Sequence, residues 1–264
     1  MTNQKPALSF SPVSATMNRG GRMKRYPRTE GYDGEWVERN WMGPNPLWLL
    51  EDLCAHLELR PGMRVLDMGC GKGLTSVFLA REYGVTVFAN DLWISADDNF
   101  RRFEEAGVAD SVFPIHAEAH ALPYAKGFFD AAISIDSYHY YGTSETYFPE
   151  VFSALVKPGG QVGIVVPGLA REFEKGYPET MARHWKAQPE LFSLHAKEWW
   201  RNLWEKTGLV RIAACYELED PKGIWRPWAD WAGEHMDFEI PDTEFLDDDT
   251  GNDIALIALA GKKP

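Results

Sequence analysis

The sequence contains little cysteine and no long apolar run. Cys54, Cys70 and Cys215 are the three cysteines among 264 residues, and they lie far apart. No Cys-x-x-Cys pair is present, so neither a structural zinc site nor a disulfide framework is expected, and reduced thiols in a cytoplasmic protein are the simplest interpretation. No apolar stretch approaches the ~20 residues that span a bilayer, and residues 1–13 lack the apolar block of a signal peptide. We therefore expect a cytoplasmic protein without a membrane partner.

Positive charge is also scarce. The chain has 27 Lys and Arg against 39 Asp and Glu, which gives a formal net charge of -12. Because an acidic chain repels the phosphate backbone, nucleic acid is not expected as a partner. Hydrophobic residues make up 45% of the chain, which is enough for a sizeable core, and the length fits one α/β domain with appendages. The sequence does not indicate an oligomeric state.

The most informative stretch is a short apolar run that ends in a carboxylate and continues into three alternate glycines. Residues 64–75 read Arg-Val-Leu-Asp-Met-Gly-Cys-Gly-Lys-Gly-Leu-Thr, a pattern that predicts a buried strand, a tight turn and a helix start. Glycine permits positive φ and lets a ligand lie on the main chain, while the helix N-terminus offers free N–H groups. The dinucleotide fingerprint Gly-x-Gly-x-x-Gly is not met, because Gly73 comes one place early. This spacing disfavours a NAD-dependent oxidoreductase.

Strands and helices are predicted to alternate along most of the chain. Apolar runs between turn signals predict strands over residues 65–68, 85–89, 112–115, 128–135, 161–166, 209–218 and 253–260. Helical spacing predicts helices over residues 45–59, 75–83, 95–106, 143–156 and 195–207. Such alternation implies a mostly parallel, doubly wound sheet with helices on both faces, and the last two strands form an antiparallel pair.

Three segments do not fit this alternation. Residues 1–44 form a predicted N-terminal arm, whose aromatic residues favour folding over a bound ligand rather than a solvated tail. Residues 168–192 and 219–251 are predicted insertions on the acceptor side of a domain that spans residues 45–264.

The Asp-x-Gly-x-Gly-x-Gly loop resembles the nucleotide-binding loop of class I S-adenosylmethionine (SAM) dependent methyltransferases. The segment 116–124 resembles this family's Gly-Asp-Ala-x-x-Leu-Pro motif, with Ala117 and Glu118 at the first two places, and residues 157–160 resemble its Lys-Pro-Gly-Gly turn. The resemblance covers about residues 45–260. It implies a seven-stranded sheet of order 3-2-1-4-5-7-6, SAM as the cofactor and methyl transfer to a small-molecule acceptor.

The resemblance also implies which residues hold SAM. The glycine loop would hold its amino-acid end, an acid past the second strand its ribose, and the 117–119 segment its adenine; the carboxylate after the fourth strand would hold either the SAM amino group or the acceptor. An acid at the second-strand position accepts ribose hydroxyls in βαβ units, although it also suits the capping of the next turn. The predicted cofactor residues are Asp67, Gly69, Cys70, Gly71, Asp91, Leu92, Ala117, Glu118, Ala119 and Asp136.

Tyr138 and His139 are the predicted catalytic residues. They follow the fourth strand, and ligands of open α/β sheets bind at the carboxyl ends of the strands. The unperturbed pKa of histidine suits a general base near neutral pH. The alternative is that both side chains merely line the pocket or cap the strand.

The acceptor is predicted less sharply than the donor. Many aromatic side chains near the site and in the second insertion favour an amine or an aromatic acceptor, by cation–π contact or stacking, and transfer to N, O or S is left open. No metal is expected, because His116, Glu118 and His120 do not have the His-Glu-x-x-His spacing. A non-catalytic SAM-binding module remains an alternative, and the nicotinamide enzyme a weaker one.

Overall fold

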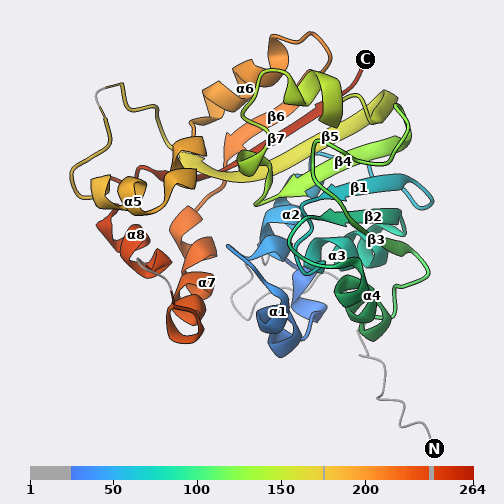
Figure 1. Ribbon diagram of the computed structural model, residues 1–264, viewed down its shortest axis with the longest axis horizontal. Helices are drawn as coiled ribbons and strands as arrows, with labels where there is room; N and C mark the ends of the chain where they lie inside the picture. Colours follow the sequence, from blue (N-terminus) through green and yellow to red (C-terminus); the bar gives the residue numbers. More distant parts are fainter. Residues whose placement is uncertain (1–24, 175, 238–240) are drawn as a thin grey trace, which may run out of the picture.

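A single seven-stranded sheet forms the centre of the molecule. The computed structural model describes residues 25–174, 176–237 and 241–264, so residues 1–24 of the predicted arm lie outside the described residues. The strand order is β3-β2-β1-β4-β5-β7-β6 (Figure 1), which confirms the predicted fold class and order. The strands are β1 Arg64–Met68, β2 Thr86–Asp91, β3 Val112–His116, β4 Phe129–Ile135, β5 Val156–Leu169, β6 Arg211–Glu217 and β7 Ile254–Lys262.

The first five strands run in parallel. β1 pairs with both β2 and β4, and β7 runs antiparallel to its two neighbours, β5 and β6. In register, Asp67 lies beside Ala89 on one side and Ile133 on the other. The loops that leave β1, β2 and β4 therefore meet at one edge of the sheet, where ligands of such sheets bind.

Helices cover both faces of this sheet (Figure 1). Asn45 caps α2 by accepting hydrogen bonds from the Leu47 and Trp48 N–H groups, and Pro46 supplies the first helical residue. Ser95 caps α4 in the same way by accepting from the Asp98 N–H. The α-helices are α1 Gly34–Asn40, α2 Pro46–Cys54, α3 Leu74–Tyr83, α4 Ala96–Glu105, α5 Ala182–Ala187, α6 Lys197–Glu205, α7 Pro221–His235 and α8 Asp242–Asp248. Shorter helical turns are η1 Thr29–Gly31, η2 Tyr138–Tyr140, η3 Phe148–Phe152 and η4 Pro189–Ser193.

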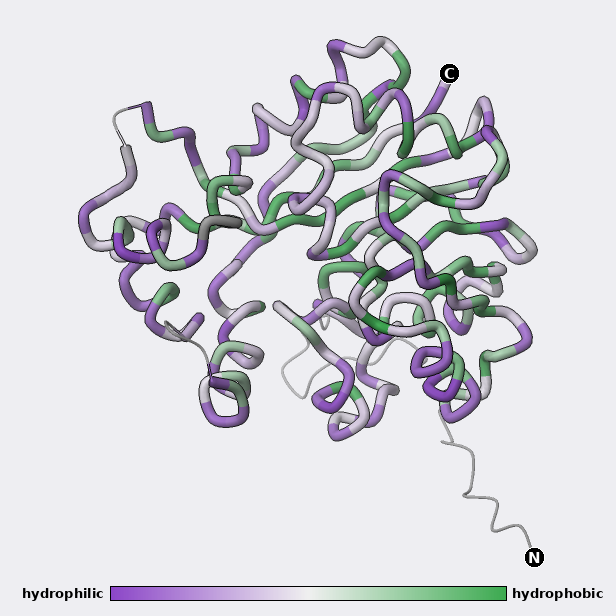
Figure 2. Tube along the Cα trace, viewed as in Figure 1, coloured by the Kyte–Doolittle hydropathy of each residue, from purple (hydrophilic) through white to green (hydrophobic). Residues whose placement is uncertain are grey.

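Two apolar layers lie on opposite faces of the sheet. Successive side chains of a strand point to opposite faces, so Val65 joins the layer under α2, α3 and α7, while Leu66 joins the layer under α6 and η3. The strands are mostly hydrophobic and the outer helix faces mostly hydrophilic (Figure 2). Among the described residues, no helix combines the length and the apolar character needed to cross a bilayer.

The structure corrects two predicted elements. The helix predicted over residues 143–156 is only the π-helical turn η3, because Pro149 has no N–H for the interior of a longer α-helix. β5 is longer than predicted and pairs with β7 as far as Leu169 and Ile254. The second insertion contains α7 and α8, which lie with α5 at one side of the molecule (Figure 1).

Trp204 is central to the layer under α6. Its side chain is fully buried and stacks on Phe148 with ring centroids 4.4 Å apart, and it contacts the Tyr138 ring edge-on at 5.8 Å. Because truncation leaves a cavity in a close-packed layer, we expect Trp204→Ala to lower the free energy of unfolding by about 3–5 kcal/mol. Urea denaturation measures this loss. Trp93, which is 67% exposed, is the control: Trp93→Ala should change stability by about 0.5 kcal/mol or less, and equal losses would contradict the packing assigned to Trp204.

Candidate functional site

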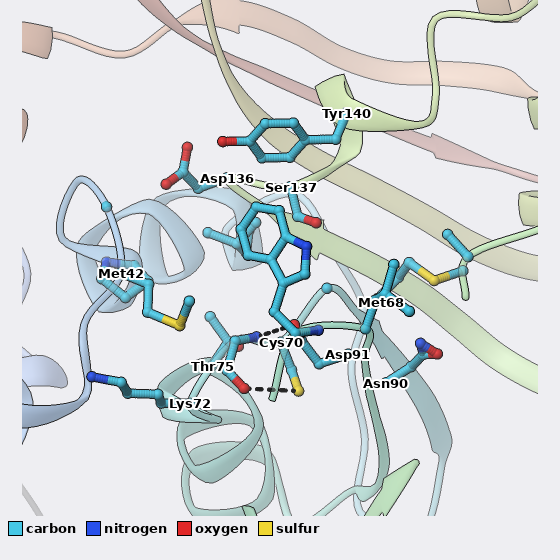
Figure 3. A pocket seen from close by; sticks show the side chains of 18 of the residues that line it. Met42, Met68, Cys70, Lys72, Thr75, Asn90, Asp91, Asp136, Ser137 and Tyr140 are labelled. Carbon is cyan, nitrogen blue, oxygen red and sulfur yellow. Dashed lines mark hydrogen bonds between the residues drawn. The ribbon is translucent and has the colours of Figure 1, made fainter. Parts of the chain in front are cut away.

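A cavity of about 260 Å³ lies where the loops after β1, β2 and β4 meet. Figure 3 shows Met42 and Lys72 on one side of it, Asp136 and Tyr140 on another, and Asp91 at its base. Nine of the ten predicted cofactor residues line the cavity, namely Gly69, Cys70, Gly71, Asp91, Leu92, Ala117, Glu118, Ala119 and Asp136. The structure therefore brings together residues that are widely separated in the sequence.

The glycine loop presents bare backbone to the cavity. Gly69 has φ +71°, and a Cβ atom on it would lie 1.9 Å from Ser137 Oγ. Its N–H and that of Cys70 donate to the Asn90 carbonyl oxygen at 2.8 and 3.0 Å, which fixes the loop against the end of β2. A side chain at Gly69 would collide with the segment after β4, so the close approach requires glycine.

Asp91 holds this loop and the next one in place. Its Oδ2 accepts from the Gly71 N–H at 2.7 Å, and its Oδ1 accepts from the Trp93 and Ile94 N–H groups at 2.7 and 2.9 Å. Each carboxylate oxygen has two acceptor positions, so one position on Oδ2 remains for a ligand hydroxyl. Asp91 thus combines the turn-capping role with geometry that suits the predicted ribose contact.

Asp67 lies behind the loop and does not line the cavity. It is fully buried, and its Oδ2 accepts from Thr75 Oγ1 and Ser76 Oγ, both at 2.6 Å. Burial raises its pKa to about 6. Its observed contacts fix the first turn of α3, so any effect on a bound ligand passes through the loop.

The segment after β3 forms the outer wall. The Ala117 N–H donates to the Asp91 carbonyl oxygen at 3.1 Å, and Asn90 Nδ2 donates to the Ala117 carbonyl oxygen at 2.9 Å. Glu118 pairs with His120, with 2.7 Å between Oε1 and Nδ1, and this bond lowers the Glu118 pKa. His116 instead bonds the Leu92 carbonyl oxygen. Across the described residues, no group of three or more His, Cys, Asp or Glu side chains is placed to hold a metal ion.

Tyr138 and His139 are not among the residues that line the cavity. Tyr138 is fully buried and packs edge-on against Trp200 and Trp204 under α6. His139 is 5% exposed, and burial lowers its pKa to about 3. The residues on either side of them in the chain, Ser137 and Tyr140, do line the cavity. The catalytic roles of Tyr138 and His139 stay predictions.

The cavity wall also contains residues outside the predicted catalytic and cofactor sets. From the loop after β4 come Ser137, Tyr140 and Tyr141, and the Tyr141 hydroxyl donates to the Met68 carbonyl oxygen at 3.1 Å. The stretch from the last residue of α1 to the first residue of α2 contributes Asn40, Met42, Gly43, Pro44 and Pro46. A Cβ atom on Gly43 would lie 1.9 Å from Asp136 Oδ2. The aromatic content of the arm predicted that it folds back, but no local signal identifies these contacts.

The buried His139 predicts how stability depends on pH. Its pKa of about 3 in the folded protein lies below the value near 6.5 in the unfolded chain. Between these values the unfolded chain binds a proton that the folded protein does not, so the free energy of unfolding falls as the pH falls through this window. From pH 7.5 to 5.5, His139→Gln should lose about 1.4 kcal/mol less than the parent protein. Urea denaturation at both values checks this, with exposed His235→Gln as the control; an imidazole that titrates near pH 6.5 by NMR would contradict the burial.

Comparison with known proteins supplies a further observation. Residues 65–160 match the family model described as a methyltransferase domain. Squalene methyltransferase 1 of Botryococcus braunii is 32% identical over 190 residues, which cover 67% of this chain and 47% of that protein. Sarcosine/dimethylglycine N-methyltransferase of Halorhodospira halochloris is 31% identical over 120 residues, or 45% of this chain and 43% of that protein. The chain therefore spans less than half the length of these curated relatives.

Solved structures show the same architecture. Geranyl diphosphate C-methyltransferase from Streptomyces coelicolor A3(2), solved with Mg²⁺, geranyl diphosphate and S-adenosyl-L-homocysteine, superposes with a TM-score of 0.64 at 18% identity and covers 81% of this chain and 77% of that one. The order of the strands, the glycine loop and the matched domain agree. The chain therefore contains a methyltransferase domain with the class I fold, which is the fold of SAM-dependent methyltransferases.

Proposed function

We propose that this protein is a SAM-dependent methyltransferase that acts on a small-molecule acceptor through an N, O or S nucleophile, with an amine or aromatic acceptor favoured. The observation that carries the proposal is the cavity in which the glycine loop, Asp91 and Asp136 meet inside a matched methyltransferase domain. Bound SAM supplies a methyl group activated by its sulfonium. The chain must hold the donor, exclude water and place a nucleophile in line.

We assign different groups of lining residues to the amino-acid, ribose and adenine parts of SAM. The backbone of Gly69 and Gly71 suits its amino-acid end, because the missing Cβ atoms leave room beside Ser137. Asp91 retains one acceptor position for a ribose hydroxyl. Leu92 and the 117–119 segment border the remaining wall, which suits the adenine. These assignments follow the prediction made from the sequence.

The opposite wall is suited to the acceptor. Asp136 lies there, and burial together with the nearby Asp242 raises its pKa well above the usual value. A carboxylate with a raised pKa is a stronger base, so Asp136 is our preferred group to take a proton from the acceptor. Tyr138 and His139 remain candidates of second rank, since both lie behind this wall.

We retain the proposed division into an arm over residues 1–44 and a methyltransferase domain over residues 45–264. The position of Met42 and Gly43 in the cavity wall supports an arm that closes over the ligands. The three relatives are named for squalene, sarcosine and geranyl diphosphate, all small molecules. Together with the net charge of -12, these names favour a small acceptor over nucleic acid. The three free cysteines support the proposed cytoplasmic location.

Gly69→Ala tests the SAM site with a matched control. Alanine at φ +71° is strained, and its Cβ would also collide with Ser137 Oγ. Gly62 has a similar φ of +82°, yet a Cβ there meets nothing within 4 Å. Both variants should lose about 1–2 kcal/mol of folding stability, because alanine is strained in the left-handed backbone conformation. Only Gly69→Ala should also bind SAM at least about ten-fold more weakly, which corresponds to ~1.4 kcal/mol of binding free energy. Isothermal titration calorimetry measures the affinity, and equal affinities would place SAM elsewhere.

Transfer itself is tested with methyl-labelled SAM. The protein is incubated with labelled SAM and the small-molecule and protein fractions of a cell extract, and mass spectrometry follows the label. Label in a small product is the expected result. Label on protein alone would replace the small-molecule acceptor with a protein. Tight SAM binding without any labelled product, across extracts and a panel of amines and phenols, would favour the non-catalytic module, whereas binding of NADH instead of SAM would favour the oxidoreductase.

A further inference from the structure

The Asp136 carboxylate lies in the cavity wall without a positive partner. Across residues 25–174, 176–237 and 241–264, no hydrogen bond or ion pair reaches its side chain. Asp136 also has φ +52°, a left-handed conformation that is rare for a residue other than glycine. Strained backbone of this kind persists where the surrounding structure holds it and is concentrated at functional sites. The fold therefore presents a carboxylate to the cavity and leaves it unpaired.

A second carboxylate lies nearby in α8. Asp242 Oδ2 accepts from the indole N–H groups of Trp225 and Trp228 at 2.9 and 3.2 Å. Asp242 and Asp136 repel each other strongly enough that Asp242 contributes to the raised pKa of Asp136. His184 also lies near Asp242, and its Nε2 already bonds Asp248 Oδ2 at 2.7 Å. Asp136 is thus the carboxylate of this pair that lines the cavity, and Asp242 adds negative charge from outside the lining.

Tryptophan rings connect the two carboxylates. Trp41 immediately precedes the Met42–Gly43 segment that contacts Asp136. Its ring packs edge-on against Trp228 with the centroids 6.2 Å apart. Trp228 in turn donates to Asp242. We name Asp136, Asp242, Trp41, Trp225 and Trp228 the acid–indole cluster, which joins the arm, the loop after β4 and the α7–α8 insertion.

We propose that the acid–indole cluster selects an amine as the acceptor and holds it as an ammonium ion before and after transfer. This inference rests on the proposed methyltransferase function and names its substrate class. The Asp136 carboxylate supplies the opposite charge at the cavity wall, and Asp242, held by the indole N–H groups, adds to the negative potential from behind it. A carbon or phenol acceptor would leave the Asp136 carboxylate without a partner in the cavity wall, at the cost that an unpaired charge carries.

The chemistry balances with the groups at hand. An incoming ammonium gives one proton to the Asp136 carboxylate and becomes a neutral amine. The nitrogen lone pair then forms a bond to the methyl carbon as the carbon–sulfur bond breaks, and that bond's electron pair stays on sulfur, which becomes neutral. The nitrogen becomes the new ammonium centre, and Asp136 returns its proton to water and pairs with that ammonium as a carboxylate. The positive charge thus moves from sulfur to nitrogen, toward the carboxylates.

Two probes of equal shape test the cluster directly. Choline carries a trimethylammonium group, and 3,3-dimethyl-1-butanol has the same shape with carbon in place of the charged nitrogen. Their affinities for the full chain saturated with S-adenosylhomocysteine are measured by ligand-observed NMR titration at constant ionic strength. Choline should bind at least about ten-fold more tightly, the change that one charge-assisted contact supplies. Equal affinities would overturn the inference.

Matched aspartate variants identify the residues responsible. Asp136→Asn suits the left-handed backbone, because asparagine tolerates this conformation, and Asp242→Asn keeps an acceptor oxygen for the indoles. Each should weaken choline binding about ten-fold, while Asp230→Asn, an exposed change on α7, should leave it unchanged. Unaltered choline affinity in both test variants would overturn the inference.

Calorimetry with S-adenosylhomocysteine separates this inference from the proposed function. Tight binding by the parent protein, with nearly the same affinity in Asp136→Asn and Asp242→Asn, is the expected result. If the parent protein does not bind it, the proposed function fails and the inference with it. If Asp136→Asn weakens this binding as much as it weakens choline binding, Asp136 belongs to the cofactor's amino group and the inference alone fails.

Discussion

The site depends on how closely the loop after β1 approaches the loop after β4. Gly69 lies so near Ser137 that even a methyl group would collide with its hydroxyl. The parallel pairing of β1 with β4 brings the two loops together, and the Asn90 carbonyl oxygen holds the glycine loop from the side of β2. Because three adjacent strands fix one turn, the loop backbone is rigid and open to a ligand. The remainder of the cavity is built around this turn.

The carboxylates around the cavity differ in how their charge is stabilised. Two serve the protein itself: Asp67 accepts from hydroxyl groups behind the loop, and Asp91 accepts mainly from backbone N–H groups. Asp242 accepts from two indoles. Asp136 differs from these three, because no described residue donates to it. A buried polar group without a partner is costly in a folded protein, so this position is the one most suited to charge supplied by a ligand.

The sequence was sufficient for the sheet and for nine of the residues that line the cavity, because both arise from local patterns. Alternating apolar runs specify strands, and a glycine loop at a strand end specifies where ligand-facing backbone lies. Local patterns do not determine which way a turn faces. In η2, Tyr138 and His139 point into the core while Tyr140 lines the cavity, and no periodicity predicts which way a single helical turn faces.

Contacts between distant segments could not be predicted from the sequence, for a different reason. The approach of Gly43 to Asp136, and the contact of Trp41 with Trp228, depend on how the arm and α7 pack over the finished sheet. Hydrophobic pattern predicts that tryptophans are buried but does not specify their partners. Trp199, for example, stacks on His195, which belongs to the same part of the chain, and takes no part in the acid–indole cluster.

In the proposed function, donor and acceptor recognition fall to different parts of the chain. The match to the methyltransferase domain over residues 65–160 takes in β1 to β4, the start of β5 and the loops between them. The acid–indole cluster draws mainly on the arm and on α7 and α8, all outside that match. Function is determined by the site added to a fold rather than by the fold itself. The geranyl diphosphate C-methyltransferase shares this fold at 18% identity, and the relatives named for squalene and sarcosine match in sequence. Because these names differ so much, the acceptor of this protein must be sought in the segments that surround the sheet.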